Sequence, residues 1–417
     1  AQRIDGSQAN FNLAASYAND TRALGIDLDI SEAAGGLISG LMDLPGRPSV
    51  SLKVAGDGLL SDFAATLDLR TDGAPRLVGT LALQSEADGP MAFDVDVNGD
   101  VTALFLPQYA EFFGPDVSLN AQGNQDSDGA LQLDSFALDT RALRLGGQAA
   151  LNRDGWPTLL DITGQVSDPN GDAVLLPAGG EETRIDAADL TVSFDASDSN
   201  ALTAAIRIAG LDRSDVKAGA VTMSMDGTLS GDVNAIGALQ VRVDLDASDL
   251  GFADPALAGA VGAVVRGGLD VGYGDDAPLR LGNLSLRGAA WDLGGNVVIQ
   301  SLSQDFATTF DVALNTPDLS AFADLAGLAL DGAGSISASG TAALGGFFDV
   351  ELNGTTQDLA LGIEQADAVL AGTTNVGLSA RRDETGTFLD ALTLNNAALA
   401  ADVSAQLQSG ASDARFD

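Results

Sequence analysis

Apolar residues alternate with polar ones, often aspartate, in many short segments of the chain. The clearest examples are residues 26–30, 93–97, 241–246 and 348–352, where Ile, Leu, Val or Phe occupy every second position. Successive side chains of a β-strand point to opposite faces, so this period of two is typical of a strand with one dry face and one wet face. The pattern predicts a protein made mostly of half-buried strands.

Turn signals separate these segments at close intervals. Asp-Gly and Asn-Gly pairs favour the tight turns that join two antiparallel strands. They occur here at Asp72-Gly73, Asn98-Gly99, Asp128-Gly129, Asp154-Gly155, Asn170-Gly171, Asp226-Gly227 and Asn353-Gly354. We therefore expect a meander of antiparallel strands.

A 15-residue pattern occurs three times with the same slip in its alternation. The copies are LDSFALDTRALRLGG from Leu133, LGNLSLRGAAWDLGG from Leu281 and LDALTLNNAALAADV from Leu389. In each copy the second apolar residue follows the first after three positions instead of two. A strand that changes parity in this way needs a bulge or a bend.

A bend repeated from unit to unit would crease a long sheet along one line. The predicted fold is therefore all-β: an elongated antiparallel sheet folded into a U-shaped trough, with a few short helices. The apolar side chains would line the inside of the trough. The expected lining residues are Ile26, Leu28, Phe93, Val95, Val97, Leu131, Leu133, Phe136, Leu138, Val241, Val243, Leu245, Leu281, Leu284, Leu286, Phe348, Val350, Leu392 and Leu394.

Four segments have helical spacing and a plausible first turn. They are a segment with Leu37 and Leu41 capped by Ser31, a segment with Tyr109, Phe112 and Phe113, a segment opened by Asp254-Pro255, and a segment opened by Thr316-Pro317 that ends at Gly327. The aromatic helix could gate the trough, or it could cover an exposed apolar edge.

We interpret residues 1–417 as one continuous repetitive segment, because no low-complexity linker divides it. Fresh strand pattern follows a glycine after each expected helix, which suggests modules at 1–45, 46–113, 114–266, 267–331 and 332–417.

Charge and composition limit which partners, cell compartments and membrane contacts are expected. The net charge is −39 with only two lysines, so nucleic acid is not expected as a partner. Because the chain has no cysteine, a compartment outside the cytoplasm is favoured. The longest apolar run, residues 255–265, is shorter than the roughly 20 residues that span a bilayer, and residues 1–10 have no signal-peptide pattern. We expect an internal segment of a longer protein, with any membrane anchor elsewhere.

Catalytic chemistry is not indicated. Without histidine or cysteine the chain lacks the usual nucleophile–base pairs and ordinary zinc or haem ligands. The pattern Asn124-x-Asp126-x-Asp128-Gly129 is similar to the opening of a calcium loop, but Ser135 stands where the closing glutamate is needed, so an acidic turn is favoured. We expect no enzyme activity, no catalytic residues, no metal and no cofactor.

Three further segments carry a family resemblance: LMDLPGRPSVSLKVAGDG from Leu41, FLPQYAEFFGPDVSLNAQG from Phe105 and PDLSAFADLAGLALDG from Pro317. With the crease repeats, they resemble the TamB family of translocation and assembly module proteins, in the AsmA-like, bridge-type lipid-transfer superfamily. The resemblance implies a β-taco fold in the periplasm of the Gram-negative cell envelope. It also implies phospholipid transport along a hydrophobic groove, a part in outer-membrane biogenesis, and partnership with the Omp85-family barrel TamA through regions outside this segment.

Two other interpretations stay open from the sequence. The apolar faces could close on each other as the dry core of a structural or adhesive β-solenoid. The chain could instead be a periplasmic chaperone that assists outer-membrane or autotransporter protein assembly by strand addition at an edge. An outer-membrane barrel is disfavoured, because aromatic residues are only 5% and form no girdles.

Overall fold

The computed structural model describes residues 9–85, 89–230, 238–274, 277–300, 306–408 and 411–416. The chain forms two compact units, one of Ala1–Asn200 with Ala204–Arg213 and the other of Ala201–Thr203 with Ser214–Asp417. Each unit is described by itself.

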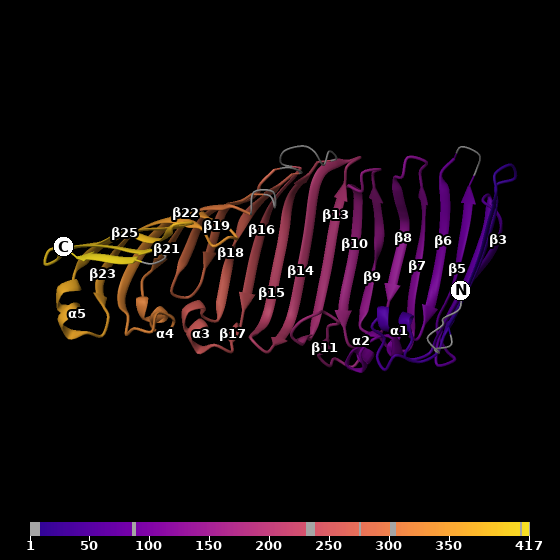
Figure 1. The fold of residues 1–417 in the computed structure, drawn as a ribbon, viewed down its shortest axis with the longest axis horizontal. Helices are drawn as coiled ribbons and strands as arrows, with labels where there is room; N and C mark the ends of the chain where they lie inside the picture. The colour runs from indigo at the N-terminus through magenta and orange to yellow at the C-terminus, as the bar shows by residue number, and fades with distance from the viewer. Residues whose placement is uncertain are drawn as a thin grey trace. The chain divides into compact units, whose positions relative to one another are not determined.

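The first unit is an antiparallel meander (Figure 1, indigo to magenta). Each strand from β1 to β10 pairs with the next, and β10 then pairs with β13. The short strands β11 and β12 form a side hairpin, and β12 also pairs with β14. The strands are β1 (Ala9–Ala18), β2 (Ala23–Glu32), β3 (Val50–Leu59), β4 (Asp62–Thr71), β5 (Ala74–Ser85), β6 (Met91–Gly99), β7 (Val117–Gln125), β8 (Leu131–Asp139), β9 (Leu143–Leu151), β10 (Pro157–Ser167), β11 (Val174–Leu175), β12 (Thr183–Ile185), β13 (Ala187–Asp195) and β14 (Ser199–Arg213).

The second unit repeats this plan (Figure 1, pink through orange to yellow). Strand β15 pairs with β16 and with the short β17, β16 pairs with β18, and from β18 to β27 each strand pairs with the next. The strands are β15 (Val216–Leu229), β16 (Leu239–Ser248), β17 (Gly251–Phe252), β18 (Val264–Tyr273), β19 (Leu279–Arg287), β20 (Asp292–Ile299), β21 (Thr308–Thr316), β22 (Asp331–Ala342), β23 (Phe348–Ala360), β24 (Thr373–Asp383), β25 (Gly386–Asn395), β26 (Ala400–Gln408) and β27 (Ala411–Phe416).

The predicted fold class is confirmed: both units are antiparallel sheets with a few short helices. The alternation explains the choice of strand, since Phe93, Val95 and Val97 of β6 are half-buried while Asp94 and Asp96 between them are exposed. Across the described residues of the first unit, β1 pairs only with β2, so that sheet is open and not closed into a barrel.

Short helices stand along one edge of each unit, called here the helix edge, and hairpin turns form most of the other edge (Figure 1). The first unit has α1 (Leu37–Leu41), η1 (Thr102–Leu104), η2 (Pro107–Tyr109) and α2 (Ala110–Phe113); the second has α3 (Pro255–Val261), η4 (Leu319–Phe322), α4 (Ala323–Ala326) and α5 (Glu364–Leu370). The four predicted helical segments are thus confirmed. Helix α5 is an addition that the sequence did not predict.

The caps agree with expectation except at α1. Asp254 accepts a hydrogen bond from the backbone N–H of Ala256 at 2.9 Å, and Gly327 ends α4 in the left-handed conformation. The prediction that Ser31 caps α1 is wrong, because Ser31 belongs to β2. The carboxylate of buried Glu32 takes that role and accepts from the N–H groups of Leu37 and Ile38.

At all three predicted slips in the apolar–polar alternation, the structure has a shift in strand register. Strand β8 shifts against β9 between Leu133 and Phe136, β19 against β20 between Leu281 and Leu284, and β25 against β26 between Leu389 and Leu392. The repeated pattern is therefore a bulged strand followed by its partner strand.

The last residue of the repeated pattern pairs with the residue just after the bulge. Phe136 pairs with Gly147, and Leu284 pairs with Gly295, while the third copy has Val403 opposite Leu392. Both glycines have φ of +148°, and a Cβ atom on Gly147 would lie 1.9 Å from the carbonyl oxygen of Asp161. Two of the three creases thus depend on a glycine that lets neighbouring strands bend closely together.

Candidate functional site: an open apolar groove

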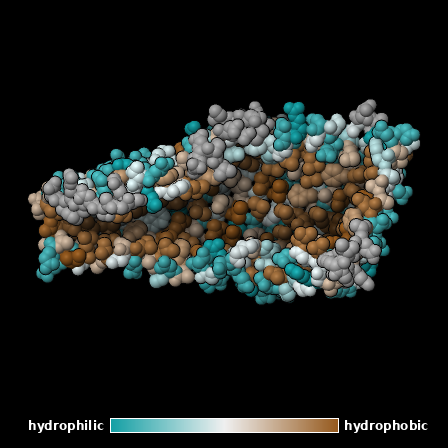
Figure 2. Space-filling model, viewed as in Figure 1, coloured by the Kyte–Doolittle hydropathy of each residue, from teal (hydrophilic) through white to brown (hydrophobic). Residues whose placement is uncertain are grey.

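One face of each unit is hollowed and hydrophobic. Figure 2 shows brown side chains on the inside of each unit and mostly teal ones along its hairpin edge. We call this hollowed face the apolar groove of the unit.

Strand register brings the predicted lining residues of the first unit into rows. Phe93 and Leu133 both pair with Gly123 of β7, which lies between their strands. In the same way Val95 and Phe136 share Ala121, and Val97 and Leu138 share Leu119.

Ile26 and Leu28 of β2 belong to the same rows, which continue from β6 back through β5, β4 and β3. Ile26 reaches the row of Val95 through Gly56, Ala65 and Leu81, and Leu28 reaches the row of Val97 through Val54, Leu67 and Gly79. Leu131 lies one row away, opposite Gln125.

The second unit has equivalent rows. Val241 pairs with Val271, which pairs with Leu281, and this row continues through Val297, Phe310 and Gly340 to Val350. Phe348 precedes Val350 on the same face of β23. A second row joins Leu284 to Leu392 through Gly295, Val312, Ala338, Leu352 and Leu378.

The remaining predicted residues of the second unit extend these rows. Leu245 pairs with Gly267, which pairs with Leu286, and Val243 pairs with Leu269. Leu394 pairs with Val376 of β24. Every predicted lining residue thus stands at an apolar-face position.

The groove is not filled by the protein's own side chains over most of these positions. Of the predicted lining residues only Val241 is buried, at 4% exposure, and the others are half-buried. Phe63, Ala65 and Phe194, which share the rows, are buried, so packing is tight locally. A dry core would bury nearly all of these positions.

The densest packing in the first unit lies at its helix edge. Phe112 of α2, Ala142, Val174 of β11 and Ile185 of β12 form a buried cluster with exposures of 2–7%, called here the rim cluster. Leu143, Val166 and Ala188, three paired residues at the end of the apolar face, pack against this cluster.

Helix α2 is fixed to the sheet at this cluster. The hydroxyl of Thr140 donates to the carbonyl of Phe112 at 2.9 Å, and Arg141 forms ion pairs with Glu111 of α2 and, at 2.9 Å, with Asp168. Phe113 also stacks on Phe105 with ring centroids 4.1 Å apart. The aromatic helix therefore covers the apolar edge, the second of its two predicted roles.

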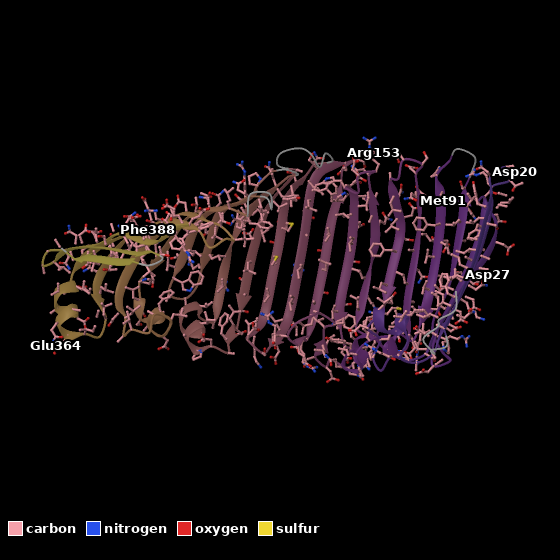
Figure 3. The ribbon with its side chains drawn as sticks, in the orientation of Figure 1. Asp20, Asp27, Met91, Arg153, Glu364 and Phe388 are labelled. Atoms are coloured by element: carbon pink, nitrogen blue, oxygen red, sulfur yellow. The ribbon has the colours of Figure 1, made fainter. Side chains whose placement is uncertain are left out.

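Large apolar side chains stay exposed along the helix edge. On α1, Leu37 and Leu41 are 60% and 85% exposed, and Leu325 and Ile363 of the second unit are about half exposed. The hairpin edge carries both charged and apolar exposed side chains, and the apolar ones include Leu344 of the second unit at 75% exposure. Figure 3 places Asp20 and Arg153 on it in the first unit, whereas Glu364 begins α5 at the helix edge of the second.

The acidic residues form structural turns. At the calcium-like sequence, the N–H of Gly129 donates to the carbonyl of Asp126, and the N–H of Ala130 donates to the side chain of Asp128. Within the described ranges no group of three or more acidic side chains is placed to hold a metal ion. Asp275 and Asp276 lie outside the described residues.

Hydrogen bonds hold several carboxylates in the charged form. The hydroxyl of Thr385 lowers the pKa of Asp383, and the amide of Asn283, followed by Arg242, lowers the pKa of Asp270. The pKa of Asp100, Asp168, Asp195 and Asp358 is also lowered by hydrogen bonding. A general acid at neutral pH needs the opposite shift.

Sequence reasoning missed several residues that share the apolar rows of the groove. Leu81, Leu119, Val271, Val312 and Leu378 all stand in the rows. Leu81, Leu119 and Leu378 are flanked by Thr, Ala, Ser, Asn or Gly, whereas Val271 and Val312 follow Asp270 and Asp311 in short apolar–aspartate alternations. The available signal was their pairing with a predicted strand across a short turn.

Comparisons of the chain with protein-family models, with curated proteins and with solved structures find no match. No helix in the described part of the chain has both the length and the apolar character needed to cross a bilayer.

Proposed function

We propose that this chain is a non-catalytic segment of a lipid conduit, in which acyl chains lie in the apolar groove of each unit. The observation that carries the proposal is the half-buried state of the apolar rows, together with the placement of the rim cluster outside them. An apolar surface that the protein does not cover itself is suited to an apolar ligand.

The energetics favour such a groove. Exposing an acyl chain to water costs about 0.8 kcal/mol per methylene group, or roughly 12 kcal/mol for a chain of 16 carbons. Rows of Leu, Val and Phe remove most of that cost. They offer few fixed polar groups, so they do not select a head group.

The family resemblance suggests where in the cell the proposed conduit would work. A segment similar to TamB and the AsmA-like proteins would work in the periplasm and carry phospholipids between the inner and outer membranes. The anchor and the contact with an Omp85-family barrel such as TamA would belong to regions outside this segment.

Photocrosslinking in living cells tests the proposal. A photoreactive residue at Val95, Leu133 or Val243 should give lipid adducts, whereas the adjacent positions Asp96, Asp134 and Asp244 on the polar face should not. Equal labelling of both sets, or of neither, would contradict the conduit.

Charge in the groove gives a second test. Val95→Arg or Leu133→Glu should block transport while the far-UV circular dichroism stays unchanged, because an open groove tolerates a charge better than a packed core does. Unfolding of both variants would instead favour the β-solenoid.

One observation favours a chaperone as the second candidate. Among the described residues β1 pairs only with β2, and it exposes Phe11, Leu13 and Tyr17 by 46–53%, which suits strand addition by a client protein. A photoreactive residue at Leu13 would then crosslink to outer-membrane proteins, and the groove positions would give protein adducts instead of lipid.

A further inference from the structure

A pocket of about 500 Å³ opens on the second unit, and its lining combines Val241 and Val271 of the groove row with a larger set of residues from the polar face of the sheet. It lies over β16, β18 and β19. Two rows cross these strands: Gln240 pairs with Gly272, which pairs with Arg280, and Arg242 pairs with Asp270, which pairs with Gly282. Because Val241 and Leu281 occupy the alternate positions, these six residues face away from the groove.

Two glycines create the hollow. Neither Gly272 nor Gly282 has a positive φ, so the backbone does not require glycine at either position. A Cβ atom on either would come no closer than 3.7 Å to its nearest neighbour, so packing does not require glycine. Glycine inside a strand costs about 0.5–1 kcal/mol relative to alanine, and here its structural effect is an open space between polar side chains.

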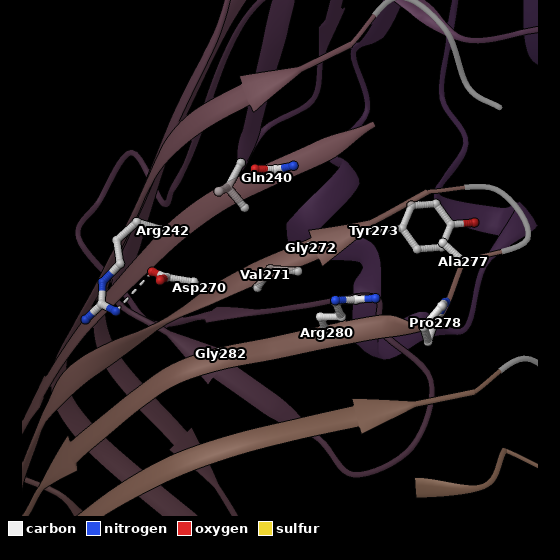
Figure 4. A pocket seen from close by; sticks show the side chains of 11 residues that line it. Gln240, Arg242, Asp270, Val271, Gly272, Tyr273, Ala277, Pro278, Arg280 and Gly282 are labelled. Atoms are coloured by element: carbon white, nitrogen blue, oxygen red, sulfur yellow. Dashed lines mark hydrogen bonds and ion pairs between the residues drawn. The ribbon is translucent and has the colours of Figure 1, made fainter. Parts of the chain in front are cut away.

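Hydrogen-bond donors around this space exceed the free acceptors. The backbones of Arg280 and Gln240 belong to the sheet, but their side chains make no hydrogen bond or ion pair with any residue in the described part of the chain. They stand on the two strands that flank β18, so their backbones are about 10 Å apart. Figure 4 shows their side chains on either side of Gly272.

Arg242 is a third donor, and its guanidinium is already oriented. It pairs with Asp244 and Asp270, each at 3.2 Å, and donates to the carbonyl of Asn283 at 3.3 Å. The second oxygen of Asp270 accepts from the amide of Asn283 at 2.5 Å. Both oxygens of this carboxylate therefore have partners, which leaves the donors of Arg280 and Gln240 for a ligand.

The charge of the pocket lining favours a ligand with a single negative charge. Asp244 and Asp270 already match the charge of Arg242, so Arg280 supplies the unpaired positive charge in the lining, on a chain with net charge −39. Repulsion from distant carboxylates is screened beyond about 8 Å at physiological salt, so a single small anion can bind where a polyanion cannot. Guanidinium groups match the two oxygens of carboxylate and phosphate groups.

We propose that this pocket binds a single oxyanion, a carboxylate or a phosphate, carried by a small molecule, with Arg280 and Gln240 as its direct ligands and Arg242 as the third donor. The site does not depend on the proposed lipid function, because its three donors lie on the other face of the sheet.

The test follows the side-chain N–H resonances of Arg280 and Gln240 in ¹H–¹⁵N spectra of the full chain. Sodium acetate and inorganic phosphate are titrated separately at constant ionic strength. We expect both resonances to shift saturably with at least one of them. Saturation by acetate alone identifies a carboxylate site and saturation by phosphate alone a phosphate site. Linear shifts with both anions would overturn the proposal.

Three variants sharpen the result. Arg280→Gln should weaken binding at least tenfold, and Gly282→Val should abolish it by filling the pocket while the backbone spectrum stays that of the native fold. The matched control is Arg287→Gln, which removes an exposed arginine from the same strand outside the pocket. If the control weakens binding as much as Arg280→Gln, the effect is general electrostatics and the site does not exist.

Discussion

The rim cluster and the apolar groove of the first unit use the same residue types with different degrees of packing. In the rim cluster, Phe112, Val174 and Ile185 are at most 7% exposed and are enclosed by α2 and the β11–β12 hairpin. In the groove, Phe93 and Val95 project from a paired sheet and are only half-buried. Apolar residues thus stabilise the first region by contact with each other and leave the second open to a ligand.

The largest expected effect separates these two regions by charge. Ile185→Asp places a carboxylate in a site that is 2% exposed, and it should lower the free energy of unfolding by more than about 4 kcal/mol. Val95→Asp places the same group where water can reach it, and should cost only about 1 kcal/mol. Urea unfolding followed by circular dichroism measures both.

The native Asp94 and Asp96 beside Val95 show that this strand tolerates carboxylates on its other face. If Val95→Asp unfolded the protein as Ile185→Asp does, the groove would be a core and the contrast between the two regions would be lost.

A smaller effect is expected at the crease. Gly147→Ala should lower the free energy of unfolding by about 1–3 kcal/mol, because alanine disfavours φ of +148° and its Cβ would clash with the carbonyl oxygen of Asp161. Gly251→Ala is the control, since a Cβ there meets nothing within 4 Å and φ is not positive. Equal thermal midpoints for Gly147→Ala and the native chain would show that the bend does not need glycine.

The strands and the three bulges could be predicted because each depends on local pattern. Alternation at Phe93–Val97 fixes which side chains share a face, and the three-residue step from Leu133 to Phe136 fixes where parity changes. The role of Gly147 could have been found as well, since the copies from Leu133 and Leu281 both end in Gly-Gly.

The rim cluster and the polar-face pocket could not be predicted, because they depend on tertiary placement. Val174 and Ile185 lie in strands of two and three residues, too short for a periodic signal. Helix α5 has no side-chain cap at Ile363, so it lacks the usual start signal. The pocket requires the register of three strands, which sets Gly272 between Gln240 and Arg280.

The smallest expected effect is a pH-dependent change in stability at the site where α2 is attached to the rim cluster. The N–H of Asn170, followed by Arg141, lowers the pKa of Asp168 below its ordinary value of about 3.9. A carboxyl group with a lowered folded-state pKa stabilises the fold fully above the unfolded pKa, and this contribution is lost as the pH falls through the folded value. Asp168→Asn should therefore be less stable than the native chain at pH 7, and the difference should shrink below about pH 4.

Urea unfolding at pH 7 and pH 3 measures that difference. Asp154→Asn, at an exposed turn on the opposite edge, is the control and should change the free energy of unfolding little at either pH. A gap between native and Asp168→Asn that stays constant from pH 7 to pH 3 would mean that the charge of Asp168 does not stabilise the rim cluster. The stability of that region would then come from its apolar packing alone.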